Sequence, residues 1–175
     1  SLLVNPFIGT DFTGNTYPGA QAPFGMVQLS PDNGLPGWDR ISGYYYPDST
    51  IAGFSHTHLS GTGAGDLYDI SYMPVTLPYR EAEAPLGIHS KFRHSDEEAS
   101  AGYYRVLLKD YNINVELTAT ERCGIQRYTF PKAQSAVFLN LKKAMNWDFT
   151  QDSHIEVVDS CTIQGYRFSD GWARG

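Results

Sequence analysis

The sequence predicts an all-β fold, an antiparallel β-sandwich, on three observations. Short segments recur roughly every ten residues, and Ile113 to Thr118 shows the alternation of apolar and polar residues that marks a half-buried strand. Turns are dense, with 17 glycines and 10 prolines in 175 residues. Only Asp96 to Ala101 has helical features, with Ser95 as its cap and acidic residues in its first turn. Short strands, many turns and almost no helix are typical of a sandwich.

The elements follow one another along the chain with turns between them. Residues 5–41 are rich in proline and glycine and contain a single predicted strand. The strands around Tyr104 and Ile113 are expected to form a hairpin. In order, the predicted strands are Met26 to Leu29, Gly43 to Tyr46, Ile51 to Phe54, Asp69 to Leu77, Tyr104 to Leu108, Ile113 to Thr118, Gly124 to Phe130, Ala136 to Leu141, His154 to Val158 and Thr162 to Phe168. Because the sequence stops at Gly175 within a turn, we expect residues 1–175 to be one sandwich domain that is incomplete at its C-terminal end.

Composition restricts the function classes. Hydrophobic residues make up 41% and charged residues 18%, as in a globular domain. The 13 basic residues are scattered among 19 acidic ones, so nucleic acid is not expected as a partner. No apolar run approaches the ~20 residues of a membrane span, and the N-terminus lacks the features of a signal peptide. Two cysteines, Cys123 and Cys161, are too few for a disulfide scaffold; we expect buried free thiols and leave their pairing open.

The stretch from Gly53 to Asp66 is the best candidate for a functional site. It carries His56 and His58 one residue apart, and then glycines at every second position. Ordinary turns need only one or two glycines, so this spacing predicts backbone packed closely against a ligand, a metal or another domain. The alternating glycines are Gly61, Gly63 and Gly65.

The two histidines have two interpretations. On an extended strand both rings would share one face, which suits a metal. A metal also needs a third and usually a fourth ligand, and the nearest downstream carboxylate, Asp66, lies beyond the glycines. A hydrogen-bonding role, either structural or in sugar recognition, is therefore favoured, and no metal is expected in this chain.

A second candidate lies in the loop that carries Trp38 and Asp39. A ring in a loop can stack on a sugar, and a neighbouring carboxylate can accept hydrogen bonds from hydroxyls. The alternative is that Trp38 caps the sandwich. The pair Glu97 and Glu98 lies in a polar run and is expected to be solvated surface, not an acid–base pair.

Several blocks of sequence, in order, resemble a known family. The resemblance runs from Val4 to at least Gly171, and its blocks are Val4-Asn-Pro-Phe-Ile-Gly-Thr10, Tyr17-Pro-Gly19, Pro23-Phe-Gly-Met26, Ser30-Pro-Asp32, Gly53-Phe-Ser-His-Thr-His-Leu-Ser-Gly-Thr-Gly63, Gly102-Tyr-Tyr104, Glu116-Leu-Thr-Ala-Thr120 and Arg127-Tyr-Thr-Phe-Pro131. Together they resemble the N-terminal domain of glycoside hydrolase family 92, the calcium-dependent exo-acting α-mannosidases.

The resemblance implies a sandwich of the galactose-mutarotase or supersandwich type, followed in the same polypeptide by a helical α/α barrel that this chain lacks. It implies hydrolysis of terminal mannose from glycans, including N-glycans, with inversion by two carboxyl groups that the barrel supplies. Calcium would also be bound mainly by the barrel. No catalytic residue is then expected in this chain, which alone should be inactive, and a periplasmic or secreted location is implied.

The same resemblance implies which residues meet the glycan. Trp38 and Asp39 match a loop that serves the leaving-sugar subsite of α-1,2-cleaving enzymes. The histidine block lies at the pocket and domain interface, which makes His56, His58, Ser60 and Gly61 substrate-binding candidates. Two alternatives remain: a free-standing carbohydrate-binding module, and a small metallohydrolase built on the two histidines.

Overall fold

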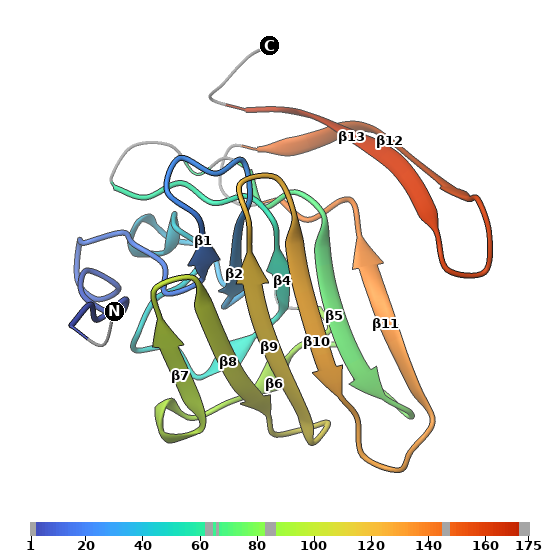
Figure 1. The fold of residues 1–175 in the computed structure, drawn as a ribbon, viewed down its shortest axis with the longest axis horizontal. Helices are drawn as coiled ribbons and strands as arrows, with labels where there is room; N and C mark the ends of the chain where they lie inside the picture. Colours follow the sequence, from blue (N-terminus) through green and yellow to red (C-terminus); the bar gives the residue numbers. More distant parts are fainter. Residues whose placement is uncertain (1–2, 62–64, 66, 83–86, 145–147, 172–175) are drawn as a thin grey trace.

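The computed structural model describes residues 3–61, 65, 67–82, 87–144 and 148–171. Two antiparallel sheets form its body and lie one over the other (Figure 1). The first sheet has the order β1-β2-β4-β5-β11 and consists of β1 (Ala20–Gln21), β2 (Gln28–Asp32), β4 (Gly53–Ser55), β5 (Ser71–Thr76) and β11 (Ser135–Asn140). The second has the order β10-β9-β8-β7 and consists of β7 (Glu97–Ser100), β8 (Tyr103–Leu108), β9 (Ile113–Ala119) and β10 (Gly124–Thr129). The predicted antiparallel β-sandwich is confirmed.

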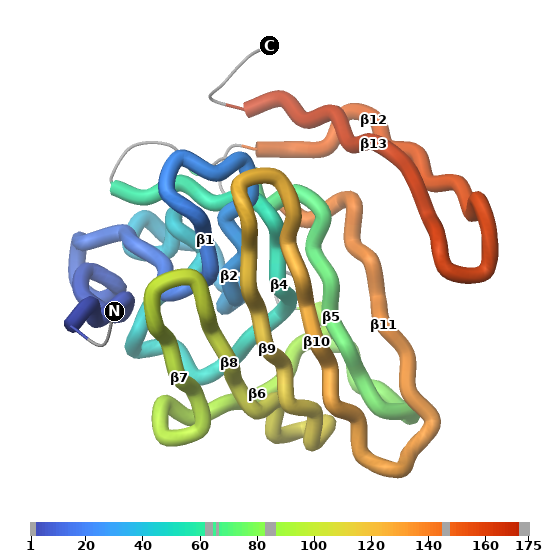
Figure 2. Tube along the Cα trace, viewed as in Figure 1, coloured from blue at the N-terminus to red at the C-terminus, as the bar shows by residue number. Residues whose placement is uncertain are grey.

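Two smaller sheets complete the described structure. β3 (Thr50–Ile51) pairs with β6 (Ser90–Lys91), and β12 (Phe149–Val157) pairs with β13 (Ile163–Asp170). The β12–β13 hairpin, orange to red in Figures 1 and 2, reaches out past β11 and away from the two layers. Within the described ranges, no helix is long and apolar enough to cross a membrane.

The core lies between the two main sheets, where the alternation of the sequence places apolar side chains. In the β8–β9 hairpin Val106 is paired with Val115 and Leu108 with Ile113, and all four side chains are buried. Phe54 is buried in the same core, as packing rather than as a site residue. The predicted hairpin is confirmed, and its turn contains Asn112 with a positive φ of 52°.

The predicted helix at Asp96 to Ala101 is wrong. A short 3-10 turn, η2 (His94–Asp96), leads into β7, which pairs with β8. The Glu97 carboxylate accepts hydrogen bonds from the hydroxyls of Tyr44 at 2.8 Å and Tyr104 at 2.6 Å. Tyr44 lies 53 residues away in sequence and Tyr104 lies on the next strand, and an extended backbone turns Glu97 inward to meet both. Glu97 is therefore not solvated surface, since 1% of its side chain is exposed, whereas Glu98 is 59% exposed as expected.

Two further expectations are corrected. The predicted strand at Gly43 to Tyr46 does not form, because its backbone donors are used elsewhere: the Tyr45 N–H donates to Asn33 Oδ1 at 2.5 Å and the Tyr46 N–H donates to Thr10 O at 2.8 Å. The cysteines are free thiols, but both are exposed rather than buried. Cys123 lies in the turn before β10 and Cys161 in the turn between β12 and β13, so neither side chain enters the core.

Candidate functional site

His56 and His58 follow the end of β4 and do not continue it, so their rings are not side by side on a strand face as predicted. The His56 Nδ1–H donates to Ile70 O at 2.8 Å, and the ring packs edge-on against Tyr72 and closely against Gly124. Burial lowers the pKa of His56, which favours the neutral ring. One ring nitrogen is thus fixed by the backbone, and Nε2 faces the start of β10.

His58 turns the other way, into the interior. Its Nδ1 lies 2.7 Å from Gln28 O, and its Nε2 lies 2.7 Å from Asp32 Oδ1 and 3.1 Å from Ser55 Oγ. Burial alone would raise the pKa of Asp32, but the positive charges of Lys143 and His58 outweigh it and hold that pKa below its ordinary value. Both ring nitrogens of His58 are therefore occupied within the protein, and the side chain is completely buried.

The described residues contain no group of three or more His, Cys, Asp or Glu side chains arranged to hold a metal ion. Gly63 and Asp66 lie outside the described residues. That this chain binds no metal stays a prediction.

A pocket of about 560 Å³ lies beside the histidine loop. His58 and Ser60 both line it, which brings two of the predicted site residues together. Its other polar groups are amides and a phenol suited to hydroxyl-rich ligands. Burial raises the pKa of Tyr17 to about 12, so its hydroxyl stays protonated and donates to Gln21 Oε1. The remaining lining residues are Pro23, Phe24, Gly25, Gln28, Leu59 and Leu67.

A second pocket, of about 620 Å³, extends this one. The two pockets share Tyr17, Gln21, Pro23 and Ser60, so they are neighbours, and together they are called the depression below. Gly61 is exposed at its side with a φ of +92°, and its N–H donates to Asn15 O at 2.6 Å. This bond fixes the start of the glycine stretch against the N-terminal loop.

Trp38 and Asp39 belong to a different segment, the 3-10 turn η1 (Trp38–Arg40), and line neither of these pockets. Trp38 is 52% exposed, so it does not occupy the core. The turn is held in place by Arg40, whose guanidinium donates from Nε and Nη2 to the two Asp48 oxygens at 2.6 Å each. The structure thus presents an aromatic ring and a carboxylate on a fixed turn.

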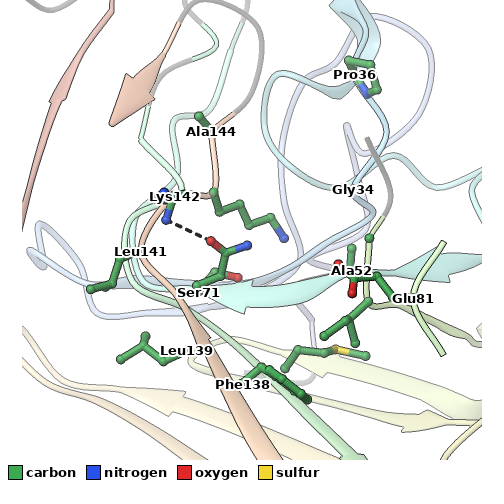
Figure 3. Close-up of a pocket in the computed structure, with 15 residues that line it drawn as sticks. Gly34, Pro36, Ala52, Ser71, Glu81, Phe138, Leu139, Leu141, Lys142 and Ala144 are labelled. Atoms are coloured by element: carbon green, nitrogen blue, oxygen red, sulfur yellow. Dashed lines mark hydrogen bonds between the residues drawn. The ribbon is translucent and has the colours of Figure 1, made fainter. Parts of the chain in front are cut away.

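A third cavity, of about 540 Å³, is shown in Figure 3. Lys143 lines it and places Nζ 3.2 Å from Asp32 Oδ2. The backbone there is ordered by a bond from the Lys142 N–H to Asn140 Oδ1 at 2.9 Å, drawn as a dashed line in Figure 3. Sequence reasoning missed the Asp32–Lys143 contact, although Asp32 belongs to the Ser-Pro-Asp block that carried part of the resemblance.

Two packed antiparallel sheets with a loop-built polar depression define the chain as a β-sandwich domain with a candidate binding site. The model of the glycosyl hydrolase family 92 N-terminal domain matches residues 3–175, and the chain therefore belongs to this family, as its N-terminal domain.

Solved structures agree with this assignment. The family GH92 α-mannosidase BT3965 from Bacteroides thetaiotaomicron, in complex with mannoimidazole, is 39% identical over 97% of this chain and 23% of its own, with a TM-score of 0.90. The inverting mannosidase BT2199 from the same species is 28% identical over 96% of this chain and 22% of its own, with a TM-score of 0.73. A secreted glycosidase of Arthroderma benhamiae is 28% identical over 73% of this chain and 17% of its own length. The chain thus spans less than a quarter of the length of these relatives.

Proposed function

We propose that the chain is the substrate-binding sandwich domain of an exo-acting, inverting α-mannosidase that releases terminal α-1,2-linked mannose from glycans, N-glycans among them. The observation that carries the proposal is the 39% identity and TM-score of 0.90, across 97% of the chain, to an α-mannosidase in complex with mannoimidazole. In this proposal residues 1–175 supply binding loops and the rest of the polypeptide supplies the two catalytic carboxyl groups. The chain alone is then inactive.

The partner domain in the proposal is a helical barrel of the same polypeptide. Large apolar side chains are exposed around the depression, and exposed apolar clusters on this scale mark interaction surfaces. Phe24 lines the pocket and is completely exposed. Leu59 also lines the pocket, and the exposed Met26 directly follows Gly25, another lining residue. Docking of the barrel onto these side chains would enclose the depression and bury them.

Calcium is assigned to the barrel for a chemical reason. Calcium takes about six to eight oxygen ligands, and the described residues hold no cluster of acidic or histidine side chains that could supply them. Both ring nitrogens of His58 face protein acceptors, which leaves no nitrogen lone pair for a metal ion. We also infer a periplasmic or secreted location, which the secreted relative from Arthroderma benhamiae supports.

Within this chain, Ser60, Gly61, Trp38 and Asp39 are proposed to meet the glycan. His56 and His58 are proposed to hold the loop, because at least one nitrogen of each ring is bonded to the protein. A sugar could reach only the edge of His56, because the His58 side chain is completely buried.

The test is the substitution Trp38→Ala in the full-length protein. We expect hydrolysis of α-1,2-mannobiose to fall several-fold or more in kcat/KM, because a stacking ring contributes ~1 kcal/mol beyond its buried area. Hydrolysis of an aryl mannoside should change little, since an aryl leaving group needs no platform. Trp38→Phe, which keeps a ring, is the matched control and should lose less. Equal losses on both substrates would contradict the proposed leaving-sugar role.

A further inference from the structure

We infer that Asp32 is a positioning residue whose buried ion pair with His58 holds the turn 37–43 and the loop 56–61 in one fixed arrangement. These segments carry the proposed glycan contacts, so the inference rests on the proposed function for its consequence, though not for its geometry. Asp32 lies at the end of β2, between the two segments, and is completely buried.

The hydrogen-bond partners of His58 determine its protonation state. Its Nδ1 faces Gln28 O, and a carbonyl oxygen can only accept a hydrogen bond. Its Nε2 faces Asp32 Oδ1 at 2.7 Å, and an ionised carboxylate can only accept. Both ring nitrogens must then donate, so His58 is an imidazolium paired with a carboxylate.

Asp32 keeps its negative charge although it is buried, because a second cation lies beside it. The Lys143 ammonium lies 3.2 Å from the other carboxylate oxygen, Oδ2, and only 9% of the Lys143 side chain is exposed. One buried carboxylate is thus flanked by two cations. Ser55 Oγ, 3.1 Å from His58 Nε2, completes the polar cluster. Removing the negative charge would leave two buried cations without a counter-charge, which proteins tolerate poorly.

The turn 37–43 packs directly against the Asp32–His58 ion pair. Gly43 ends this turn with a φ of +88°, and a Cβ built there would lie 2.7 Å from Asp32 Oδ1 and 3.0 Å from His58 Cδ2. The Gly43 carbonyl accepts from the Asn33 N–H at 2.8 Å. The Tyr68 hydroxyl donates to Ile41 O, and its ring packs edge-on against His58. The turn therefore rests directly on the ion pair.

The loop 56–61 is attached through His58 itself. Because its two N–H groups bind acceptors on β2 at residues 28 and 32, the ring fastens the loop to that strand. In the part of the chain that the structure describes, the charged and titratable groups around the ring are Asp32, Lys143, Tyr17, Tyr68 and His56. Asp32 is the only anion in this set, so it is the group on which both segments depend.

The test is Asp32→Asn in the full-length protein, followed by hydrogen exchange and mass spectrometry. Asparagine keeps the shape and removes the charge. We expect amide exchange in peptides that cover 37–43 and 56–61 to accelerate together, at least ~10-fold, because breaking a buried ion pair is strongly destabilising. Glu98→Gln is the control: Glu98 pairs with Arg105 on the surface, and its loss should leave both peptides unchanged. Unchanged exchange in either peptide of the Asp32 variant would overturn the inference.

If Asp32→Asn does not fold, native-state exchange of the unsubstituted protein in low denaturant decides instead. Segments held by one pair should open together, with a shared denaturant dependence for peptides around residues 32, 37–43 and 56–61. Opening of 37–43 while Asp32 and the histidine loop stay protected would overturn the inference.

The coupling between two substitutions, measured by activity, separates positioning of Trp38 from a purely structural role of Asp32. On α-1,2-mannobiose, Asp32→Asn should lower kcat/KM, and the loss should shrink when Trp38→Ala is already present, because the ring to be positioned is gone. Fully additive losses would contradict positioning of Trp38. An unsubstituted full-length protein without mannosidase activity would contradict the proposed function alone, and the exchange result would still decide the role of Asp32.

Discussion

Replacing Gly43 with alanine is expected to destabilise the domain by about 2–5 kcal/mol, against about 1–2 kcal/mol for the same change at Gly102. Both glycines have positive φ, +88° and +78°, and a Cβ in this region costs ~1–2 kcal/mol at either site. At Gly102 nothing lies within 4 Å of the added atom. At Gly43 the atom would meet Asp32, Tyr68 and His58 at 2.7 to 3.0 Å, and overpacking of this kind adds ~1–3 kcal/mol.

Urea unfolding of the 175-residue chain, with both variants beside the unsubstituted protein, measures this difference. Gly102→Ala is the matched control, because it carries the backbone strain without the steric clash. Equal midpoints for the two variants would mean that the turn 37–43 does not rest on the Asp32–His58 pair.

Replacing Arg167 with methionine is expected to cost about 3–5 kcal/mol, since it removes one partner of a buried ion network. The Arg167 side chain is 1% exposed and joins the β12–β13 hairpin to the body. Its guanidinium donates to two carboxylates and to three other oxygens: Asp69 Oδ1, Asp148 Oδ2 at 2.7 Å, Lys143 O at 3.0 Å, and Leu141 O and Thr150 Oγ1 at 3.1 Å. Methionine keeps an unbranched apolar chain in place of the arginine stem and satisfies none of these acceptors.

The loss of the Arg167 network should also loosen the loop that carries His56 and His58. Asp69 Oδ2 accepts from the Thr57 hydroxyl at 2.8 Å, so the network continues from β13 to the residue between the two histidines. We expect faster proteolysis of the hairpin and a lower unfolding midpoint. Arg127→Met is the control, because Arg127 is 72% exposed in its pair with Glu116 and its loss should change little. A hairpin as resistant as in the unsubstituted chain would show that Arg167 does not fasten it.

Local patterns predicted the β-sandwich well. The strand at Ile113 was evident because a strand with one buried face alternates apolar and polar residues. The helix at Asp96 was wrong for the opposite reason: its local signals are genuine, but Glu97 gains Tyr44 and Tyr104 as partners only in the folded chain. The contact with Tyr44, 53 residues away, leaves no local signal in the sequence around Glu97.

In the candidate site, too, local features could be predicted from the sequence and long-range contacts could not. The histidine loop was visible because glycines and histidines cluster in one stretch, and the exposed ring of Trp38 fits its flanking Gly37 and Asp39. The role of Asp32 was not visible, because its partners His58 and Lys143 lie 26 and 111 residues away in sequence. The sequence could identify candidate residues, but the connection between them exists only in the fold.

A crystal structure of the full-length protein with mannoimidazole or a non-hydrolysable α-1,2-mannobioside would test directly whether this domain binds substrate. We expect a sugar enclosed between this domain and the rest of the polypeptide, within hydrogen-bonding distance of the loop at Ser60 and Gly61, with Trp38 against the second sugar. A ligand held entirely by residues beyond Gly175, with Trp38 and the histidine loop remote from it, would contradict the claim that this domain binds substrate.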